Sequence, residues 1–377
     1  MKYFIIAGEA SGDLHASNLV KQLRILDENA VFAGWGGDLS IDAGVDVKKH
    51  IKDLAFMGFV EVLQNLFTIQ KNFKECKAEI KSYNPDVIIF VDYPGFNLRM
   101  AEWAKKNNFR TIYLISPNVW AWKTSRVYKI KDYVDKMYVI LPFEKDFYKK
   151  YDIEVEYFGN PLVDLVNNYS PKTFDTFCRE NNLSGKPVVA LMAGSRKQEI
   201  KKMLPLMLKS STYFPDYEFI ITGAPAIEKR FYDEYLKGYD VKLIFNQTYE
   251  ILSHSVAGLI TSGTATLEAA LFKVPQVVCY KGNIISVIIA GLILHIKHIS
   301  LVNIILDKEC VKELIQNKLT VKNIKEELEK VIPEGVNYKK IMDDYNNLYN
   351  ILNNPDIYLS IADSILRLIR SEKDSIK

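Results

Sequence analysis

Four short segments of the sequence carry residue types that could bind or transfer a phosphorylated group. The first, Gly8–Asp13 (GEASGD), follows a short apolar run and precedes a helical pattern. Its glycines permit a tight turn and the close approach of a ligand, and free N–H groups at a helix start bind anions or hydroxyls. A plain strand–helix turn capped by Ser11 or Asp13 would look the same. Glu9 favours a ligand site, because a carboxylate at the carboxyl end of a strand faces the ligand crevice of α/β folds.

The second segment, Asp92–Asn97 (DYPGFN), directly follows the apolar run Val87–Val91. Asp92 therefore stands at a predicted strand end, where a general base could meet a substrate hydroxyl. The alternative is an aspartate that only supports a Pro-Gly turn. We favour the base, with Glu9 as a rival for the same role.

The third segment, Leu191–Arg196 (LMAGSR), ends a predicted strand, and Gly194 and Ser195 open the next helix. A guanidinium is always charged and binds phosphate oxygens in pairs, so Arg196 suits a diphosphate. A surface arginine without a ligand is the alternative. Because a helix N-terminus disfavours a cation, Arg196 at this position indicates an anionic partner.

The fourth segment, Thr261–Glu268 (TSGTATLE), again joins a buried strand to a helix. Ser262, Gly263 and Thr264 would form a phosphate-binding nest at the helix N-terminus. Glu268 lies one turn inside the helix, where it could accept hydrogen bonds from ribose hydroxyls. A capping box is the alternative, but Thr264 and Glu268 are one residue too far apart for it.

Other features exclude several classes of protein. The chain has no Walker loop, no Asp-x-Asp triple and no G-x-S-x-G elbow, and its four cysteines and five histidines show no zinc spacing. We therefore expect neither metal nor cofactor, and Arg196 and helix N-termini must neutralise leaving-group charge. The net charge of +3 over 377 residues gives no indication of a nucleic-acid partner.

Short apolar runs alternate with helical patterns in two series, which predicts two doubly wound α/β domains with parallel sheets. The polar stretch 167–186 is the expected joint, and the strand pattern stops after about Ile299. We expect domains at 1–168 and 185–345, with helices over 346–377 that cross back to the first domain. The expected strands are Tyr3–Ala7, Val31–Ala33, Val87–Val91, Thr111–Ile115, Met137–Ile140, Val155–Phe158, Val188–Met192, Glu218–Thr222, Lys242–Ile244, Gly258–Ile260 and Gln276–Cys279.

Taken in order, these segments resemble the lipid A disaccharide synthase family. The matching motifs run over nearly the whole chain: AGEASGD (Ala7–Asp13), MGFVEV (Met57–Val62), DYPGFN, SPNVWAW (Ser116–Trp122), LPFE (Leu141–Glu144), GNPL (Gly159–Leu162), GSR, SGTATLE, Pro275–Lys281 and LVNII (Leu301–Ile305). The resemblance implies the two-Rossmann-domain fold called GT-B. It also implies an inverting, metal-free transfer of 2,3-diacylglucosamine from UDP to the 6-hydroxyl of 2,3-diacylglucosamine 1-phosphate, at the cytoplasmic face of the inner membrane.

The resemblance also implies roles for particular residues. Glu9, Asp92, Arg196 and Asn303 carry over by motif position, with Asn303 on the donor side. On the acceptor side we expect Gly12, Met57, Glu61 and Asn97. The sequence departs from the family pattern at three positions: Gly95 stands for Asp, Asn160 for His and Ala193 for Pro.

One expected helix, Met57–Ile80, has an apolar side and a row of lysines, which is typical of a helix on an anionic membrane surface. A core-facing helix with a solvated lysine face is the alternative. The apolar stretch Ile284–Ile296 is too short to span a bilayer. The chain could be a monomer or a homodimer. A UDP-sugar 2-epimerase of the same fold and a non-catalytic two-lobed binding protein are the alternative functions.

Overall fold

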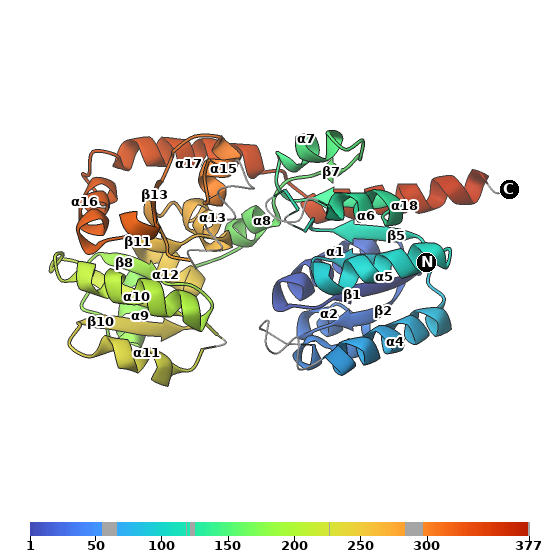
Figure 1. Cartoon of the computed structure of the whole chain (residues 1–377), viewed down its shortest axis with the longest axis horizontal. Coiled ribbons are helices and arrows are strands. Elements are labelled where there is room, and N and C mark those ends of the chain that lie inside the picture. The colour runs from blue at the N-terminus through green and yellow to red at the C-terminus, as the bar shows by residue number, and fades with distance from the viewer. Residues whose placement is uncertain (55–65, 118, 121–124, 226, 283–296, 376–377) are drawn as a thin grey trace. The chain divides into compact units, whose positions relative to one another are not determined.

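The computed structural model describes residues 1–54, 66–117, 119–120, 125–225, 227–282 and 297–375, and it divides into two compact units (Figure 1). The first unit comprises Met1–Pro161 together with Asn354–Lys377, and the second comprises Leu162–Asn353. The division therefore falls at Pro161 and Asn353, earlier than 168 and later than 345, the boundaries that the sequence suggests.

The first unit is built on a parallel sheet. Among the described residues it has seven strands in the order β3-β2-β1-β4-β5-β6-β7. The strands are β1 (Lys2–Ala7), β2 (Val31–Gly36), β3 (Asp46–His50), β4 (Val87–Val91), β5 (Thr111–Leu114), β6 (Lys136–Val139) and β7 (Glu156–Tyr157). The order reverses between β1 and β4, so this pair is the topological switch point of the sheet.

Helices cover both faces of this sheet because side chains alternate along each strand. Tyr3 and Ile5 of β1 pack with α1 and α18, whereas Phe4 and Ile6 pack with α4, α5 and α6. The helices are α1 (Ala10–Leu26), α2 (Asp38–Asp42), η1 (Ile51–Asp53), α4 (Leu66–Tyr83), α5 (Pro94–Lys106), α6 (Arg126–Tyr133), α7 (Glu144–Lys149) and the C-terminal α18 (Ile357–Ser375).

The second unit repeats this plan. Its described residues form six parallel strands in the order β10-β9-β8-β11-β12-β13, with the switch point between β8 and β11. The strands are β8 (Val188–Met192), β9 (Glu218–Gly223), β10 (Val241–Phe245), β11 (Ser255–Thr261), β12 (Gln276–Tyr280) and β13 (Lys312–Ile315). The helices are α8 (Pro161–Asn167), α9 (Phe174–Asn181), α10 (Lys197–Ser211), α11 (Lys229–Leu236), α12 (Thr248–His254), α13 (Thr264–Leu271), α15 (Leu301–Leu306), η2 (Gln316–Lys318), α16 (Val321–Val331) and α17 (Tyr338–Leu352).

The two-domain α/β prediction is confirmed, and all the expected strands are present. Two further strands, β3 and β13, lie at sheet edges and carry charged sequences, DVKKH and KELI, so the apolar pattern did not show them. The expectation that strands stop after Ile299 was therefore wrong. An edge strand needs only one neighbour and tolerates charged side chains.

The polar stretch 167–186, the expected joint, lies within the second unit. It contains α9, whose Phe177 is fully buried in the second unit's core. The carboxylate of Glu250 holds the segment before α9, accepting from the Tyr169 hydroxyl at 2.5 Å and from the backbone N–H of Lys172 at 2.8 Å.

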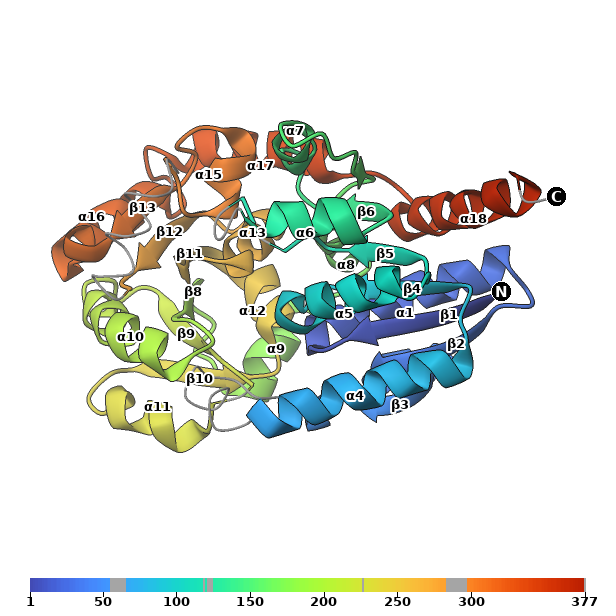
Figure 2. The same ribbon diagram turned by 45° about the vertical axis from the view of Figure 1, so that its right-hand side comes forward.

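A C-terminal helix does cross back to the first unit, as the sequence suggested. It is α18 alone: Ile361 and Ile365 pack in the first unit's core, whereas Leu348 and Leu352 of α17 pack in the second unit's core. Both views show red α18 beside the blue-to-green elements, while orange-red α17 lies beside the orange helices α13 and α15 (Figures 1 and 2).

Candidate active site

The topology groups the four predicted segments into two sites, one in each unit. Glu9 follows β1 and Asp92 follows β4, and these strands are hydrogen-bonded neighbours at the first switch point. In the second unit Arg196 follows β8 and Gly263 follows β11, which flank the other switch point. Ligands of doubly wound folds bind at this position. We call these groups the first-unit site and the second-unit site.

Asp92 is the most perturbed carboxylate of the first-unit site. Burial raises its pKa to about 6, the negative charge of Glu9 adds to the rise, and the backbone N–H of Tyr93 opposes it. A base with a pKa near the working pH combines a large deprotonated fraction with useful basicity. The environment of Asp92 therefore suits a general base.

The turn that carries Asp92 is tightly constrained. Asp92 and Tyr93 both have left-handed backbone conformations, with φ of 46° and 49°, which are uncommon for residues other than glycine. Gly8 packs against the Tyr93 ring so closely that a Cβ there would lie 2.3 Å from a ring carbon. Gly8 of the first motif therefore leaves space for the Tyr93 ring in the turn of the second motif.

Asn97, predicted on the acceptor side, is fully buried, and among the described residues its side-chain oxygen has no hydrogen-bond partner. Its amide nitrogen donates to the carbonyl oxygens of Asp92 at 2.8 Å and of Ile6 and Val91 at 3.3 Å each. It therefore joins the ends of β1 and β4.

Glu9 and Asp13 of the first motif have different environments. Glu9 is exposed and is the N-cap residue of α1, but its side chain caps nothing. Neither Ser11 nor Asp13 caps α1. The buried Asp13 carboxylate instead accepts from the backbone N–H groups of Gly37 at 2.7 Å and Ser40 at 3.1 Å, at the start of α2. Gly12 is buried beside the sheet, but a Cβ there would make only ordinary contacts, 3.6 Å from the Val91 carbonyl oxygen, so packing does not require glycine.

In the second-unit site, Arg196 is exposed and paired. Its side chain is 80% exposed, and its guanidinium donates to Glu199 Oε1 at 3.0 Å. The other oxygen of Glu199 accepts from the backbone N–H groups of Ser195 at 3.0 Å and Arg196 at 3.3 Å. Gly194 has a φ of 116°, and a Cβ there would lie 2.6 Å from the Glu199 carboxylate. Glu199 thus satisfies the groups that the sequence assigns to a phosphate.

The start of α13 is open. Gly263 is its N-cap residue, with a φ of 146° that favours glycine and with nothing within 4 Å of its Cβ position. Thr264 is exposed, and Ser262 donates to the Ile299 carbonyl at 2.8 Å. Glu268 receives a long hydrogen bond of 3.4 Å from the Tyr249 hydroxyl, and burial raises its pKa.

Asn303 is fully buried, and its amide is completely engaged. Its oxygen accepts from the N–H groups of Cys310 at 2.8 Å and Val311 at 2.9 Å. Its nitrogen donates to the Val311 carbonyl at 2.8 Å and to Glu313 at 2.9 Å. These contacts hold α15 against β13, so the structure gives Asn303 a positioning role rather than an open side chain.

Met57 and Glu61 lie outside the described residues, as do the whole MGFVEV motif, part of the SPNVWAW motif and Ile284–Ile296. The three residues that depart from the family pattern lie in the part of the chain that the structure describes. Gly95 is exposed with open space at its Cβ position, Asn160 is buried and donates to the Ile140 carbonyl at 3.0 Å, and Ala193 is buried. Packing therefore does not require glycine at position 95.

Several residues that support the sites carry no local signal in the sequence. Tyr113 donates its hydroxyl to the Asp92 carbonyl at 2.6 Å, and Tyr249 contacts Glu268. Both are ordinary core residues in sequence, and their roles depend on the strand order and the packing of distant segments. The LPFE motif could have indicated Glu144, a buried carboxyl whose pKa burial raises to about 7 and which accepts from the Leu141 N–H at 3.0 Å.

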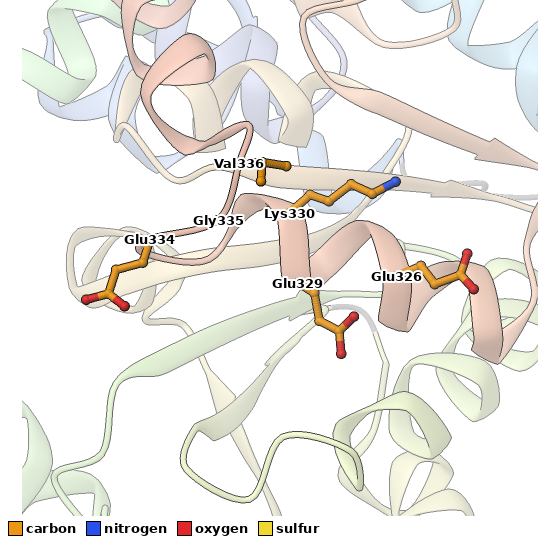
Figure 3. Close-up of a pocket in the computed structure, with 6 residues that line it drawn as sticks. All are labelled: Glu326, Glu329, Lys330, Glu334, Gly335 and Val336. Carbon is orange, nitrogen blue, oxygen red and sulfur yellow. The ribbon is translucent and has the colours of Figure 1, made fainter.

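Other features of the described residues do not form an alternative site. A hollow at the end of α16 is lined by Glu326, Glu329, Lys330, Glu334, Gly335 and Val336 (Figure 3). Two of its carboxylates, Glu326 and Glu329, pair with lysines of the same helix, as is common on a solvated helix face. The described part of the chain contains no group of three or more His, Cys, Asp or Glu that could hold a metal ion. It also contains no helix long and apolar enough to cross a membrane.

The described part of the lysine-rich helix, α4, favours the core-facing alternative. Its Cys76 and Ile80 are buried in the first unit's core and Phe73 packs against that core, while Lys71, Lys74 and Lys81 are exposed. The lysines thus form a solvated face, whatever else that face contacts.

Comparison with known proteins gives the family. A family model described as Lipid-A-disaccharide synthetase matches residues 3–360. The lipid-A-disaccharide synthase of Syntrophus aciditrophicus (strain SB) is 35% identical over 375 residues, which cover 97% of each chain. The lipid-A-disaccharide synthase of Myxococcus xanthus is 34% identical over 378 residues, covering 98% of this chain and 97% of the relative.

Solved structures support the fold. A UDP-GlcNAc 2-epimerase from Neisseria meningitidis, bound to UDP-GlcNAc, superimposes with a TM-score of 0.68 at 13% identity, covering 97% of this chain and 100% of the other. The glycotransferase of kitacinnamycin gives a TM-score of 0.67 at 10% identity, covering 98% and 99%. At such identities the likeness shows the fold alone, and that fold is the expected GT-B arrangement of two parallel-sheet domains.

Proposed function

This chain belongs to the lipid-A-disaccharide synthetase family of glycosyltransferases, and we propose on that premise that it transfers 2,3-diacylglucosamine from UDP to the 6-hydroxyl of 2,3-diacylglucosamine 1-phosphate. The products are a β-1′,6-linked tetraacyl disaccharide 1-phosphate and UDP. The observation that carries the proposal is the carboxylate pair at the first switch point, in a chain whose relatives are named for this disaccharide.

In the proposed step Asp92 takes the proton of the acceptor's 6-hydroxyl. The hydroxyl oxygen then bonds to the anomeric carbon of the donor, and the bond from that carbon to the UDP oxygen breaks with inversion. A primary hydroxyl has a pKa far above neutrality, so its proton must leave as the new bond forms. The raised pKa of Asp92, about 6, makes it a stronger base than an ordinary aspartate.

Glu9 contributes charge to the same site. Its negative charge helps to raise the pKa of Asp92, and its own position on an exposed helix start leaves it free to hydrogen-bond a sugar hydroxyl. We assign it an orienting role, and the base role falls to it only if Asp92 proves dispensable.

The second-unit site binds the donor in this proposal. Arg196 neutralises the diphosphate as the glycosidic bond breaks, and the N–H groups at Gly263 and Thr264 bind phosphate oxygens. Glu268 accepts from the ribose hydroxyls. The diphosphate must compete with Glu199, whose carboxylate pairs with Arg196.

We further propose that the enzyme works at the cytoplasmic face of the inner membrane. The acyl chains of both substrates reside in the bilayer, and exposed lysines of α4, including Lys71, Lys74 and Lys81, offer cations to anionic lipid. Vesicle sedimentation with and without anionic lipid tests this contact, and binding that ignores lipid charge would exclude the lysine face.

The direct test supplies both acylated precursors and detects the tetraacyl disaccharide 1-phosphate by mass. UDP release should require the acceptor. A 2-epimerase of the same fold would convert a UDP-sugar without any acceptor, and a binding protein would release no UDP. Acceptor-independent conversion of the donor would therefore refute the proposal.

A further inference from the structure

We propose that Tyr113 is a positioning residue for Asp92: its buried hydroxyl, together with the amide of Asn97, holds the Asp92 carbonyl and so fixes the turn that presents the carboxylate. The inference rests on the proposed role of Asp92 as the base. It adds a residue of β5 that no sequence motif contains.

The Asp92 carbonyl is held by two donors from different elements. Tyr113 on β5 donates its hydroxyl at 2.6 Å, and Asn97 on α5 donates its amide at 2.8 Å. The N–H of Asp92 also donates to the Leu114 carbonyl at 3.0 Å. Both polar groups of the Asp92 backbone are therefore held, and the Asp92–Tyr93 peptide cannot rotate without breaking the two hydrogen bonds to its carbonyl.

The turn needs such support because its backbone conformation is unfavourable. Two consecutive residues, Asp92 and Tyr93, are left-handed without being glycine. Conformations of this kind persist only where the surroundings hold them, and they concentrate at functional sites. If one donor were removed, the turn could relax toward an ordinary conformation and carry the Asp92 carboxylate away from its place at the strand end.

The Tyr113 hydroxyl can be removed without changing how the rest of the side chain packs. Its side chain is fully buried in the core between the sheet and α5, near Phe90 of the neighbouring strand. A phenylalanine would fill this space equally well. The hydroxyl adds one contact, and that contact is with the residue proposed to take the proton.

The experiment compares two single-atom deletions in the full-length chain, Tyr113→Phe and Tyr138→Phe. Tyr138 is a matched control, because it lies on the neighbouring strand β6, is equally buried, and donates its hydroxyl to Ser364 Oγ at 2.9 Å, away from Asp92. Melting temperature, turnover, donor KM and the pH profile of kcat/KM are measured for both variants, using acylated donor and acceptor.

Tyr113→Phe should lower kcat about tenfold, a part of the 10²–10⁴ that a positioned base contributes, with donor KM unchanged. Its acid limb should move to lower pH, because a displaced Asp92 is better solvated. Tyr138→Phe should keep kcat and the pH profile with a similar loss of thermal stability. Equal kcat losses in both variants, or a Tyr113→Phe variant within twofold of the parent, would overturn the proposal.

Asp92→Asn separates this inference from the proposed function. If Asp92→Asn is impaired and Tyr113→Phe is not, the base role stands and the positioning role fails. If Asp92→Asn retains activity, the base role fails, and the positioning role fails with it whatever Tyr113→Phe does. Support requires that both variants are impaired and that Tyr113→Phe changes the pH profile.

Discussion

The two sites lie at equivalent places in equivalent sheets, yet they are built differently. In the first unit, Asp92 is partly buried, its turn is left-handed, and its backbone is held by Asn97 and Tyr113. In the second unit, Arg196 is 80% exposed and pairs with the neighbouring Glu199. Both designs begin from a strand–turn–helix at a switch point.

The difference follows from what each site is proposed to do. A proton transfer requires a base in one place with a tuned pKa, and burial and fixed hydrogen bonds provide both. Binding a diphosphate requires charge that can reach the ligand, and an exposed arginine can exchange one anion for another. Substitutions in the first-unit site should therefore lower kcat. Substitutions in the second-unit site should weaken donor binding as well as lower kcat.

The largest expected effect is that of Asp92→Asn. The amide keeps the size of the side chain but cannot take a proton, so kcat should fall about 10³-fold, within the range for a positioned base. Glu9→Gln should reduce kcat less.

In the parent enzyme kcat/KM should fall as pH falls through about 6, because only deprotonated Asp92 is a base. UDP binding, measured by calorimetry, should stay unchanged; if Asp92→Asn keeps most activity and Glu9→Gln does not, Glu9 is the base.

Arg196→Ala should have the next largest effect. Losing a cation that neutralises the leaving diphosphate costs about 2–4 kcal/mol in the transition state, or about 10²-fold in turnover. Circular dichroism should show an intact fold, since the side chain is 80% exposed and its ion pair is with Glu199 on the same helix start. Near-normal turnover would remove Arg196 from the mechanism.

Glu199 offers a sharper form of the same test. If its carboxylate competes with the diphosphate for Arg196 and for the N–H groups of Ser195 and Arg196, then Glu199→Gln should lower the donor KM. A raised donor KM would mean that Glu199 holds this loop in its binding conformation instead.

The fold was largely predictable because its signals are local. Apolar runs bounded by turn residues gave every central strand, and glycine-rich strand ends gave the motifs. The failures are equally physical. The edge strands β3 and β13 carry too many charged residues for the apolar pattern to predict them. Helix α9 was not predicted because its buried Phe177 lies in an otherwise polar stretch.

The structure shows where each predicted site residue lies, and the roles of these residues stay predictions. Asp92 and Arg196 were proposed because strand ends meet ligands in this fold, and both do follow strands at the switch points. Asn97 and Asn303 were expected beside substrate, yet both are fully buried and bind backbone groups. Sequence shows an amide near a strand end, whereas only the packing shows whether it faces a ligand or the chain.

Glu268→Gln should have a moderate effect, confined to the donor. Replacing a carboxylate that accepts from ribose hydroxyls weakens hydrogen bonds worth about 1.5–3 kcal/mol, so donor KM should rise about tenfold. Acceptor KM should change little. A change confined to acceptor kinetics would contradict the assignment, and Tyr249→Phe should produce a smaller change in the same direction because its 3.4 Å contact is weak.

The smallest effect on activity is expected from the contact that fastens α18 to the first unit. His15 of α1 lies 2.7 Å from the Tyr358 hydroxyl of α18, and burial lowers the pKa of His15 to about 4. The pKa of this histidine is lowered in the folded state and ordinary in the unfolded state. The folded state is therefore favoured only while the histidine is neutral. The contribution of neutral His15 to the free energy of unfolding should therefore be fully present above about pH 6.5. That contribution should be lost as pH falls from there to about 4.

His15→Gln tests this assignment, because glutamine is neutral at every pH and can still hydrogen-bond. The His15 contribution to the free energy of unfolding by urea should fall by about 3 kcal/mol between pH 7 and pH 4, which is the expected linkage for a shift of this size. The raised pKa values of Asp92 and Glu144 act with the opposite sign in this range, so the His15 contribution is the difference between the parent and His15→Gln. The variant should lose most of that dependence, whereas His50→Gln, at the exposed edge strand β3, should retain it. At pH 8 all three proteins should turn over within about twofold, since His15 touches neither site. If His15→Gln keeps the full pH dependence, the destabilisation at low pH arises elsewhere, and α18 is not held by a neutral histidine.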